Sequence, residues 1–566
     1  MTRGSGSGMG RLEVRVLRGI VLVLGAVHVA LLLYVVGARF AYPVDAEWMT
    51  GSVRDAVERV KAGLPVYAEP SAEYVAFLYP PLYYWLAALV ARVTSTFVAC
   101  KVVSIGATAV AAGAVGRLAR SLGADRFWTA VSVLLHVAAF SLTLFFYDLE
   151  RVDPLGSALV VSGVAVLLGR GRPEREVVRT AVAGALLGLA FFAKQPGLFA
   201  FGGAALGLFV AGERKRALVF AAAGGLVLLG IGAYLEVTTH GWWRYYCLKL
   251  PGAHGVEPAL LSVFFITDLP KAFLLAGGSV AVVAWEARAL LARRRGEDAP
   301  SDARSVVFAV LLVALLAASF SLRAHRGGWQ NVLLAWTPLG CAAAGVAASR
   351  ALAKAGSNRL VEAGLLGLAV LQLLGLVFDP NDVAPGPSDV ADKEKLVRIV
   401  RELEKEGDVV VTPVGNVTRH MHFHSAALFD VLRANDPAPK DHLENLLARR
   451  YSAIFVDAPF EVHCKQKGCR DIDEAMARNY FVACRLEEHE HTGMAGFDAR
   501  PRWILRPRKE PLASGDWASL EQRRRVEMGL AAMREQRRGQ GAPPAVDDAI
   551  EGIAATPDPR WGDARP

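Results

Sequence analysis

Blocks of consecutive apolar residues recur along the first two thirds of the chain, and they restrict its fold more than any other feature. Each block holds about 16–22 residues and is bounded by Arg, Lys, Gly or Pro, and a bilayer core of about 30 Å is crossed by roughly 20 helical residues. Hydrophobic residues make up 53% of the 566 residues. The sequence therefore predicts an all-α polytopic membrane protein.

Clusters of Arg and Lys fall between alternate apolar blocks, at 116–126, 169–179, 212–216 and 288–298. Short cytoplasmic loops of membrane proteins carry such an excess of positive charge. Placing all clusters on one side gives about 11 transmembrane helices, the first at roughly 18–40, if residues 79–93 form a re-entrant or interfacial helix that does not cross. The net charge of +9 is explained by these loops, so we expect a lipid bilayer and no nucleic acid as partner.

Hydropathy falls after residue 378, and short apolar segments then alternate with helical ones. This pattern predicts a small α/β domain on the extracytoplasmic side. It contains Cys464, Cys469 and Cys484, which favour a disulfide in an oxidising compartment, and a histidine-rich segment, 420–424, for which metal binding is the weaker interpretation. The predicted parts are a cytoplasmic tail (1–17), a transmembrane catalytic domain (18–378), a linker (379–389), the α/β domain (390–508), and a basic helix with a disordered tail (509–566).

Two acids, Asp45 and Glu47, follow the first span in an Asp-x-Glu arrangement. Carboxylates two residues apart can point to one place, where they suit a general base or a hard metal ion. The alternative is a pair of solvated loop acids. An amphipathic helix at 52–62 and the segment Tyr79-Pro80-Pro81 come next on the same predicted face.

A second acidic loop, between the third and fourth spans, holds Asp148, Glu150 and Arg151. Arg151 suits either an internal ion pair or a phosphate ligand. Asp153, just before Pro154, is expected to cap the next helix.

Three cations are predicted on this same outer face: Lys194, His325 and Arg326. Lys194 divides one apolar stretch at a tight turn, where a lysine can either snorkel to the interface or contact an anion. His325 and Arg326 lie in a short loop between later spans. The sequence therefore gathers acids and bases from distant segments at one end of the bundle.

The order of these segments resembles that of GT-C-fold membrane glycosyltransferases, in particular glycosyltransferase family 39 and the protein mannosyltransferase-like group. The resemblance covers roughly residues 18–350 and is carried by Asp45 and Glu47, then GLPVY, YPPLYYWLAAL, DLERVDPL and AFFAKQPG. It implies transfer of a sugar from a polyprenyl-phosphate-linked donor to a hydroxyl or amine of a lipid, glycan or protein acceptor. The expected location is the extracytoplasmic face of a bacterial inner membrane, and a single displacement would invert the anomeric centre.

The resemblance also implies roles for individual residues. Asp45 matches the first-loop catalytic acid and is the expected base, with Glu47 as the neighbouring acid. Whether a divalent cation, Mg²⁺ or Mn²⁺, binds Asp45 and Glu47 stays open, because Asp-x-Glu matches neither the adjacent Asp-Glu nor the Asp-x-Asp of relatives. The expected substrate-binding residues are Tyr79, Asp148, Glu150, Arg151, Lys194, His325 and Arg326.

Two other functions are alternatives to this one. A polysaccharide polymerase or ligase would centre on a long, arginine-rich outer loop late in the chain, whereas the loop near His325 is short. A transporter without transferase chemistry would show internal repeats and ionisable groups at mid-membrane. Here the charges lie mainly at the ends of the spans.

Overall fold

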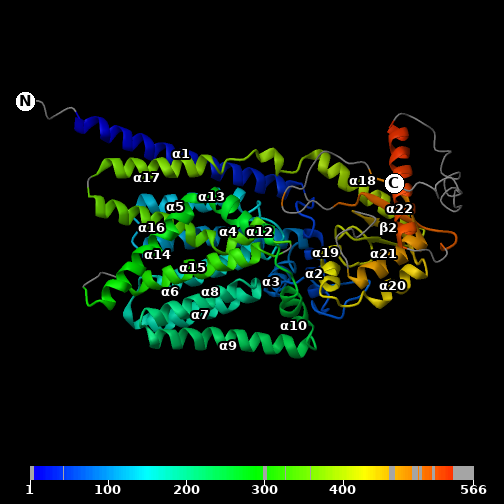
Figure 1. The fold of residues 1–566 in the computed structure, drawn as a ribbon, viewed down its shortest axis with the longest axis horizontal. Coiled ribbons are helices and arrows are strands. Elements are labelled where there is room, and N and C mark those ends of the chain that lie inside the picture. Colours follow the sequence, from blue (N-terminus) through cyan, green and yellow to red (C-terminus); the bar gives the residue numbers. More distant parts are fainter. Residues whose placement is uncertain are drawn as a thin grey trace, which may run out of the picture.

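Apolar helices run side by side along the long axis of the molecule, and a smaller domain with a sheet covers one end of the bundle (Figure 1). The computed structural model describes residues 6–42, 44–297, 302–325, 327–356, 358–457, 466–486, 495, 500–512 and 517–539. The bundle helices are α1 (Gly6–Ala41), α4 (Thr96–Ser121), α5 (Arg126–Leu142), α6 (Asp153–Leu168), α7 (Glu176–Ala193), α8 (Gly197–Val210), α9 (Arg214–Thr238), α14 (Phe273–Arg294), α15 (Ala303–Arg323), α16 (Thr337–Ala355) and α17 (Arg359–Leu374).

Each apolar block expected to be a span contains one of these helices. Within the described residues, six helical segments are long and apolar enough to cross a membrane, and α5, α6 and α8 are shorter apolar helices. The protein is an integral membrane protein. α1 begins at Gly6, so the first helix already includes most of the residues predicted as the tail (1–17).

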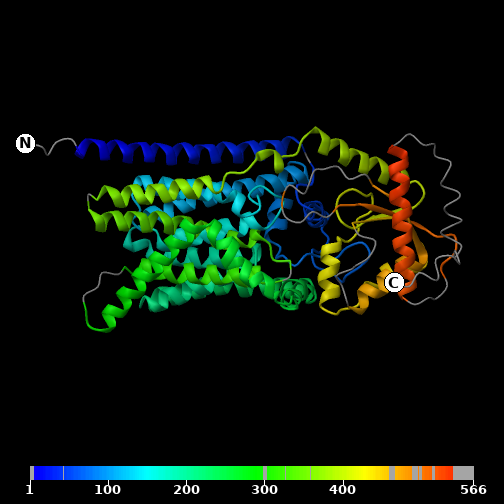
Figure 2. The ribbon, with the colours of Figure 1, turned by 45° about the horizontal axis from the view of Figure 1, so that its top comes forward.

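Successive bundle helices alternate in direction, so the loops fall at two ends. Segments 44–95, 143–152, 194–196, 239–272, 324–325 and 327–336 lie at the end that carries the smaller domain (Figures 1 and 2). Contacts join these segments: the side chain of Gln195 donates to the carbonyl of Leu78, and Val256 and His325 form an isolated antiparallel β-bridge. The expectation that these segments share one face is confirmed.

The segment between α1 and α4 forms two short helices, α2 (Thr50–Lys61) and α3 (Leu82–Val90). Nine residues of α3 extend about 13 Å, less than half of a hydrocarbon core. The segment therefore returns to the end from which it started, as the predicted non-crossing helix requires. Short helices α10 (Trp242–Arg244), α11 (Leu250–Gly252), α12 (Pro258–Val263) and α13 (Leu269–Lys271) lie at the same end.

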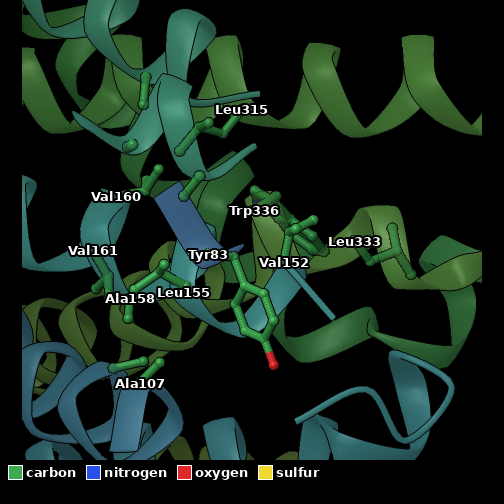
Figure 3. Close-up of a cluster of buried hydrophobic side chains, with 14 of the residues drawn as sticks. Tyr83, Ala107, Val152, Leu155, Ala158, Val160, Val161, Leu315, Leu333 and Trp336 are labelled. Atoms are coloured by element: carbon green, nitrogen blue, oxygen red, sulfur yellow. The ribbon is translucent and has the colours of Figure 1, made fainter. Parts of the chain in front are cut away.

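The centre of the bundle is a cluster of buried apolar side chains around α6, to which the flanking elements contribute (Figure 3). Tyr83 of α3 reaches into this cluster, and its hydroxyl bonds the carbonyl of Cys100 at 3.0 Å. α7 and α9 cross closely where Gly184 meets Gly224: a Cβ on Gly184 would lie 2.4 Å from the carbonyl oxygen of Phe220. Small residues commonly allow such close helix contacts in membranes.

The smaller domain contains a four-stranded sheet in the order β1-β2-β4-β3. β1 and β2 are parallel, and the other pairs are antiparallel, with Ile454 opposite Leu505. The elements are α18 (Pro387–Leu403), β1 (Asp408–Val411), α19 (Ser425–Arg433), α20 (Lys440–Leu447), β2 (Tyr451–Val456), α21 (Lys467–Asn479), β3 (Tyr480–Arg485), β4 (Trp503–Pro507) and α22 (Trp517–Gly539).

The domain does not end at residue 508 as predicted. α22 packs on the sheet, because its Glu527 accepts from the amide of Val482 and its Arg524 is buried against the carbonyl of Tyr480. The histidine-rich segment 420–424 contains no strand and leads into α19. Cys469 is disulfide-bonded, and Cys464 lies outside the described residues.

Candidate functional site

A cavity of about 480 Å³ lies between the end of the bundle and the smaller domain. Five of the predicted site residues line it, and they come from four separate segments of the bundle. Aromatic and aliphatic side chains, among them Phe77, Phe146 and Trp329, form much of the remaining wall. The predicted residues that line the cavity are Glu47, Tyr79, Arg151, Lys194 and His325.

Glu47 is held in the wall of this cavity by Arg151. Nη1 of Arg151 donates to both carboxylate oxygens of Glu47, at 3.1 and 3.0 Å, and the amide of Met49 donates to Oε2. Nη2 of Arg151 donates to the hydroxyl of Tyr79 at 2.7 Å. Burial raises the pKa of Glu47 to about 7, although the charge of Arg151 acts against the rise. Glu47 therefore exchanges a proton readily near neutral pH.

Asp45 lies two residues away but is not among the described residues that line the cavity. Oδ1 pairs with Nη2 of Arg54 at 2.5 Å, and Oδ2 pairs with Nζ of Lys393, on α18, at 3.1 Å. Burial would raise the pKa of Asp45, but the charges of Lys393 and Arg54 outweigh it and hold the pKa below its usual range. A carboxylate so strongly stabilised in its charged form is a weak base, and the role of Asp45 as the catalytic base stays a prediction.

Asp148 and Glu150 belong to a buried ion network instead of the cavity wall. Arg39 pairs with Asp148 at 2.7 Å, Arg54 pairs with Glu150 at 3.3 Å, and Lys101 lies 3.6 Å from each acid. The five side chains are no more than 4% exposed. Neither acid is among the described residues that line the cavity, and their role in substrate binding stays a prediction. Lys101, an ionisable residue within an apolar span, was the sequence signal for this network.

Lys194 lines the cavity with its charge already paired. Its Nζ lies 2.5 Å from Oδ1 of Asp153, which also accepts from Asn331 at 2.8 Å. The side chain of Asp153 does not cap α6, contrary to the prediction, because the helix begins at Asp153 itself and the carboxylate turns to Lys194. His325 faces His254, with ring centroids 6.5 Å apart, and Arg326 lies outside the described residues.

The smaller domain supplies one wall of the cavity through α19. Four residues of this helix, spaced at i, i+3, i+4 and i+7, form a single stripe facing the space: Ala426, Phe429, Asp430 and Arg433. Asp430 pairs with Nε2 of His254 at 2.9 Å and so ties the wall to the bundle. Sequence reasoning missed this stripe; the amphipathic spacing of 425–433 was the available signal.

The described residues do not fit a divalent cation at the first loop. No cluster of three His, Cys, Asp or Glu suited to a metal occurs in the described part of the chain, and the oxygens of Asp45 and Glu47 already bind cationic side chains. In the histidine-rich segment, Nδ1 of His424 accepts from the amide of Ala426 and Nε2 lies 3.0 Å from the carbonyl of Pro413. That ring therefore caps α19 and does not ligate a metal.

Comparisons with known proteins place this fold. No protein-family model and no curated protein matches the chain. ArnT from Cupriavidus metallidurans in the apo state has a TM-score of 0.52 at 13% identity, over 86% of this chain and 97% of that chain. The same protein bound to undecaprenyl phosphate gives 0.51 at 14%, over 86% and 98%.

A third solved structure is similar at a comparable level. The oligosaccharyltransferase AglB from Archaeoglobus fulgidus, in complex with an inhibitory peptide and a dolichol-phosphate, has a TM-score of 0.50 at 12% identity, over 81% of this chain and 73% of that chain. All these neighbours are GT-C-fold proteins. The chain described here therefore has the GT-C fold of membrane glycosyltransferases, with a small C-terminal sheet domain over the end of its helical bundle.

Proposed function

We propose that this protein transfers a sugar from a polyprenyl-phosphate-linked donor to a hydroxyl or amine of an acceptor. The observation that carries the proposal is the cavity at the end of the bundle, where Glu47 stands beside Arg151 and Lys194. The neighbours of similar fold were solved with undecaprenyl phosphate and with a dolichol-phosphate, which supports a lipid-linked donor.

The proposed reaction is a single displacement at the anomeric carbon. The acceptor oxygen or nitrogen forms a bond to this carbon while the bond from the carbon to the phosphate oxygen breaks, and polyprenyl phosphate leaves. The proton of the acceptor passes to Glu47, and the anomeric configuration inverts. A positioned general base contributes about 10²–10⁴-fold to such a step.

The surrounding residues have distinct parts in this proposal. Arg151 orients the carboxylate of Glu47 and links it to Tyr79. Lys194, already paired with Asp153, lines the same cavity, where a cation adds to the stabilisation of a phosphate leaving group. The apolar wall formed by residues such as Phe77 and Phe146 is suited to the first isoprene units of the donor.

Glu47→Gln tests the base. Expressed at wild-type levels in membranes of a deletion strain, this variant should lose about 10²–10⁴-fold of transfer, measured by mass spectrometry of envelope glycans and glycoproteins. Asp45→Asn is the matched comparison and should retain more activity, because Asp45 is already neutralised by Arg54 and Lys393. An active Glu47→Gln beside an inactive Asp45→Asn would return the base role to Asp45. Unchanged glycans with altered solute uptake in the deletion strain would favour a transporter.

We further propose that the cavity opens to the extracytoplasmic side of a bacterial inner membrane. The basic clusters at 116–126, 169–179 and 212–216 lie at the end of the bundle away from the cavity, as positive-inside topology requires. Glu69 and Arg172 are exposed at opposite ends. A membrane-impermeant maleimide should label Glu69→Cys and spare Arg172→Cys in intact cells, and the reverse pattern would contradict the orientation.

A further inference from the structure

We infer that Arg433, supplied by the smaller domain, is the anion-binding residue of the cavity and holds a phosphate-class group. The residue lies in the last turn of α19 and lines the cavity as the final member of the stripe. The inference deepens the proposed function and rests on it where the anion is the phosphate of a lipid-linked donor.

The charges around the cavity single out this side chain. Arg151 is bound to Glu47, Lys194 to Asp153, and His254 to Asp430. The charges of Arg151 and Lys194 are thus already balanced by carboxylates, and one nitrogen of the His254 ring is committed to Asp430. Among the described residues, Arg433 is the arginine or lysine of the cavity wall that has no carboxylate partner.

His325 does not supply a second permanent charge. Burial, together with the neighbouring imidazole of His254, lowers the pKa of His325, which favours the neutral ring. It can donate one hydrogen bond but adds no fixed positive charge. The excess charge of the described cavity wall is therefore carried by the guanidinium of Arg433.

Local packing prepares this guanidinium for an anion. Its Cζ lies 5.7 Å from the ring centroid of Phe429, one turn earlier in the same stripe. An arginine held against an aromatic ring presents its planar fork outward, and two parallel N–H donors match two oxygens of a phosphate. An anion bound there would lie in the cavity that Lys194 and Arg151 also line.

This arrangement makes the site a composite of two domains. The anion can be the phosphate of a polyprenyl-phosphate or a free anionic group such as that of an acceptor. Both have the same oxygens and charge, and a binding experiment can separate them because only the first carries a lipid chain.

The experiment uses the full-length protein in nanodiscs, with undecaprenyl phosphate, undecaprenol and inorganic phosphate as probes. Trp48 and Trp329 line the cavity, so tryptophan fluorescence reports binding. Arg433→Gln should weaken binding of undecaprenyl phosphate by about tenfold or more and leave undecaprenol unchanged, and Arg433→Lys should fall between the two. Arg398→Gln, on α18 with a side chain that is 71% exposed, is the matched control and should bind as the wild type does.

The outcomes separate the sources and the proposals. If Arg433→Gln weakens binding of inorganic phosphate and not of undecaprenyl phosphate, the subsite holds a free anion and not the lipid phosphate. The wild type could bind inorganic phosphate through Arg433 and yet bind undecaprenyl phosphate no more tightly than undecaprenol. That result would support the anion subsite and contradict the proposed lipid-linked donor. Unchanged binding of both phosphates by folded Arg433→Gln and Arg433→Lys would overturn the inference.

Discussion

The contact between α2 and the loop at 413–416 offers a direct test of how the smaller domain sits on the bundle. A Cβ on Gly51 would lie 2.6 Å from the carbonyl oxygen and 2.8 Å from the amide nitrogen of Gly415. Ordinary contact begins at 3.4 Å, and all the nearest atoms are backbone, so Gly51→Ala must push the two segments apart by about 0.8 Å.

The free-energy cost of Gly51→Ala to the docking of the smaller domain can be estimated. Overpacking of a well-packed contact costs about 1–3 kcal/mol, which shifts an equilibrium between docked and undocked domain by about 5- to 150-fold. The amide of Asn416 reports on the contact, because it donates to Oδ2 of Asp55 at 3.2 Å across the interface. Its hydrogen exchange in the full-length protein should accelerate by the same factor in Gly51→Ala.

Hydrogen-exchange mass spectrometry of peptides covering 413–417 gives the measurement. Gly37→Ala on α1 is the matched control, because a Cβ there meets nothing within 4 Å. Transfer activity should fall in Gly51→Ala although no cavity residue is altered, since α19 follows this loop and forms the cavity wall. Exchange at Asn416 no faster than in Gly37→Ala would refute the close docking.

Other expectations concern protons and buried charge. Burial raises the pKa of Asp55 to about 7 despite the opposing charge of Arg54, so the folded protein binds this proton more tightly than the unfolded chain does. That stability is present below the unfolded pKa near 4 and is lost as the pH rises through about 7, so the Tm of the wild type should fall more over this window than that of Asp55→Asn. Burial raises the pKa of Glu47 to about 7 against the charge of Arg151, so turnover should rise through about pH 7 as Glu47 loses its proton. A pH profile of turnover that is unchanged in Glu47→Asp, which has an altered carboxylate, would argue against this. Arg54→Met leaves the carboxylates of Asp45 and Glu150 without their shared cation and should lower the free energy of unfolding, measured with denaturant, by about 3–5 kcal/mol. Adding Glu150→Gln should recover part of this loss. A loss below about 1 kcal/mol would show that the network is not buried.

The patterns of hydropathy and charge in the sequence predicted most of the helical architecture correctly. Apolar blocks of bilayer length predicted every bundle helix, because helix formation in a membrane depends on the local run of residues. The alternation of basic loops predicted which segments share an end of the bundle, and Arg54, joining the first acidic loop to the second, confirms it. β4 and the attachment of α22 escaped prediction, since a five-residue strand and a basic helix carry weak local signals.

The assignment of roles within the first loop could not be read from the chain. Asp45 and Glu47 lie two positions apart in the same loop, and the residues beside them in sequence do not show which one is ion-paired and which one faces the cavity. What separates them is the partner of each carboxylate: Lys393, 348 residues away, neutralises Asp45, and Arg151 orients Glu47 at the cavity. The reactivity of a buried acid depends on the charges within a few ångströms of it, and those neighbours are set by packing between distant segments.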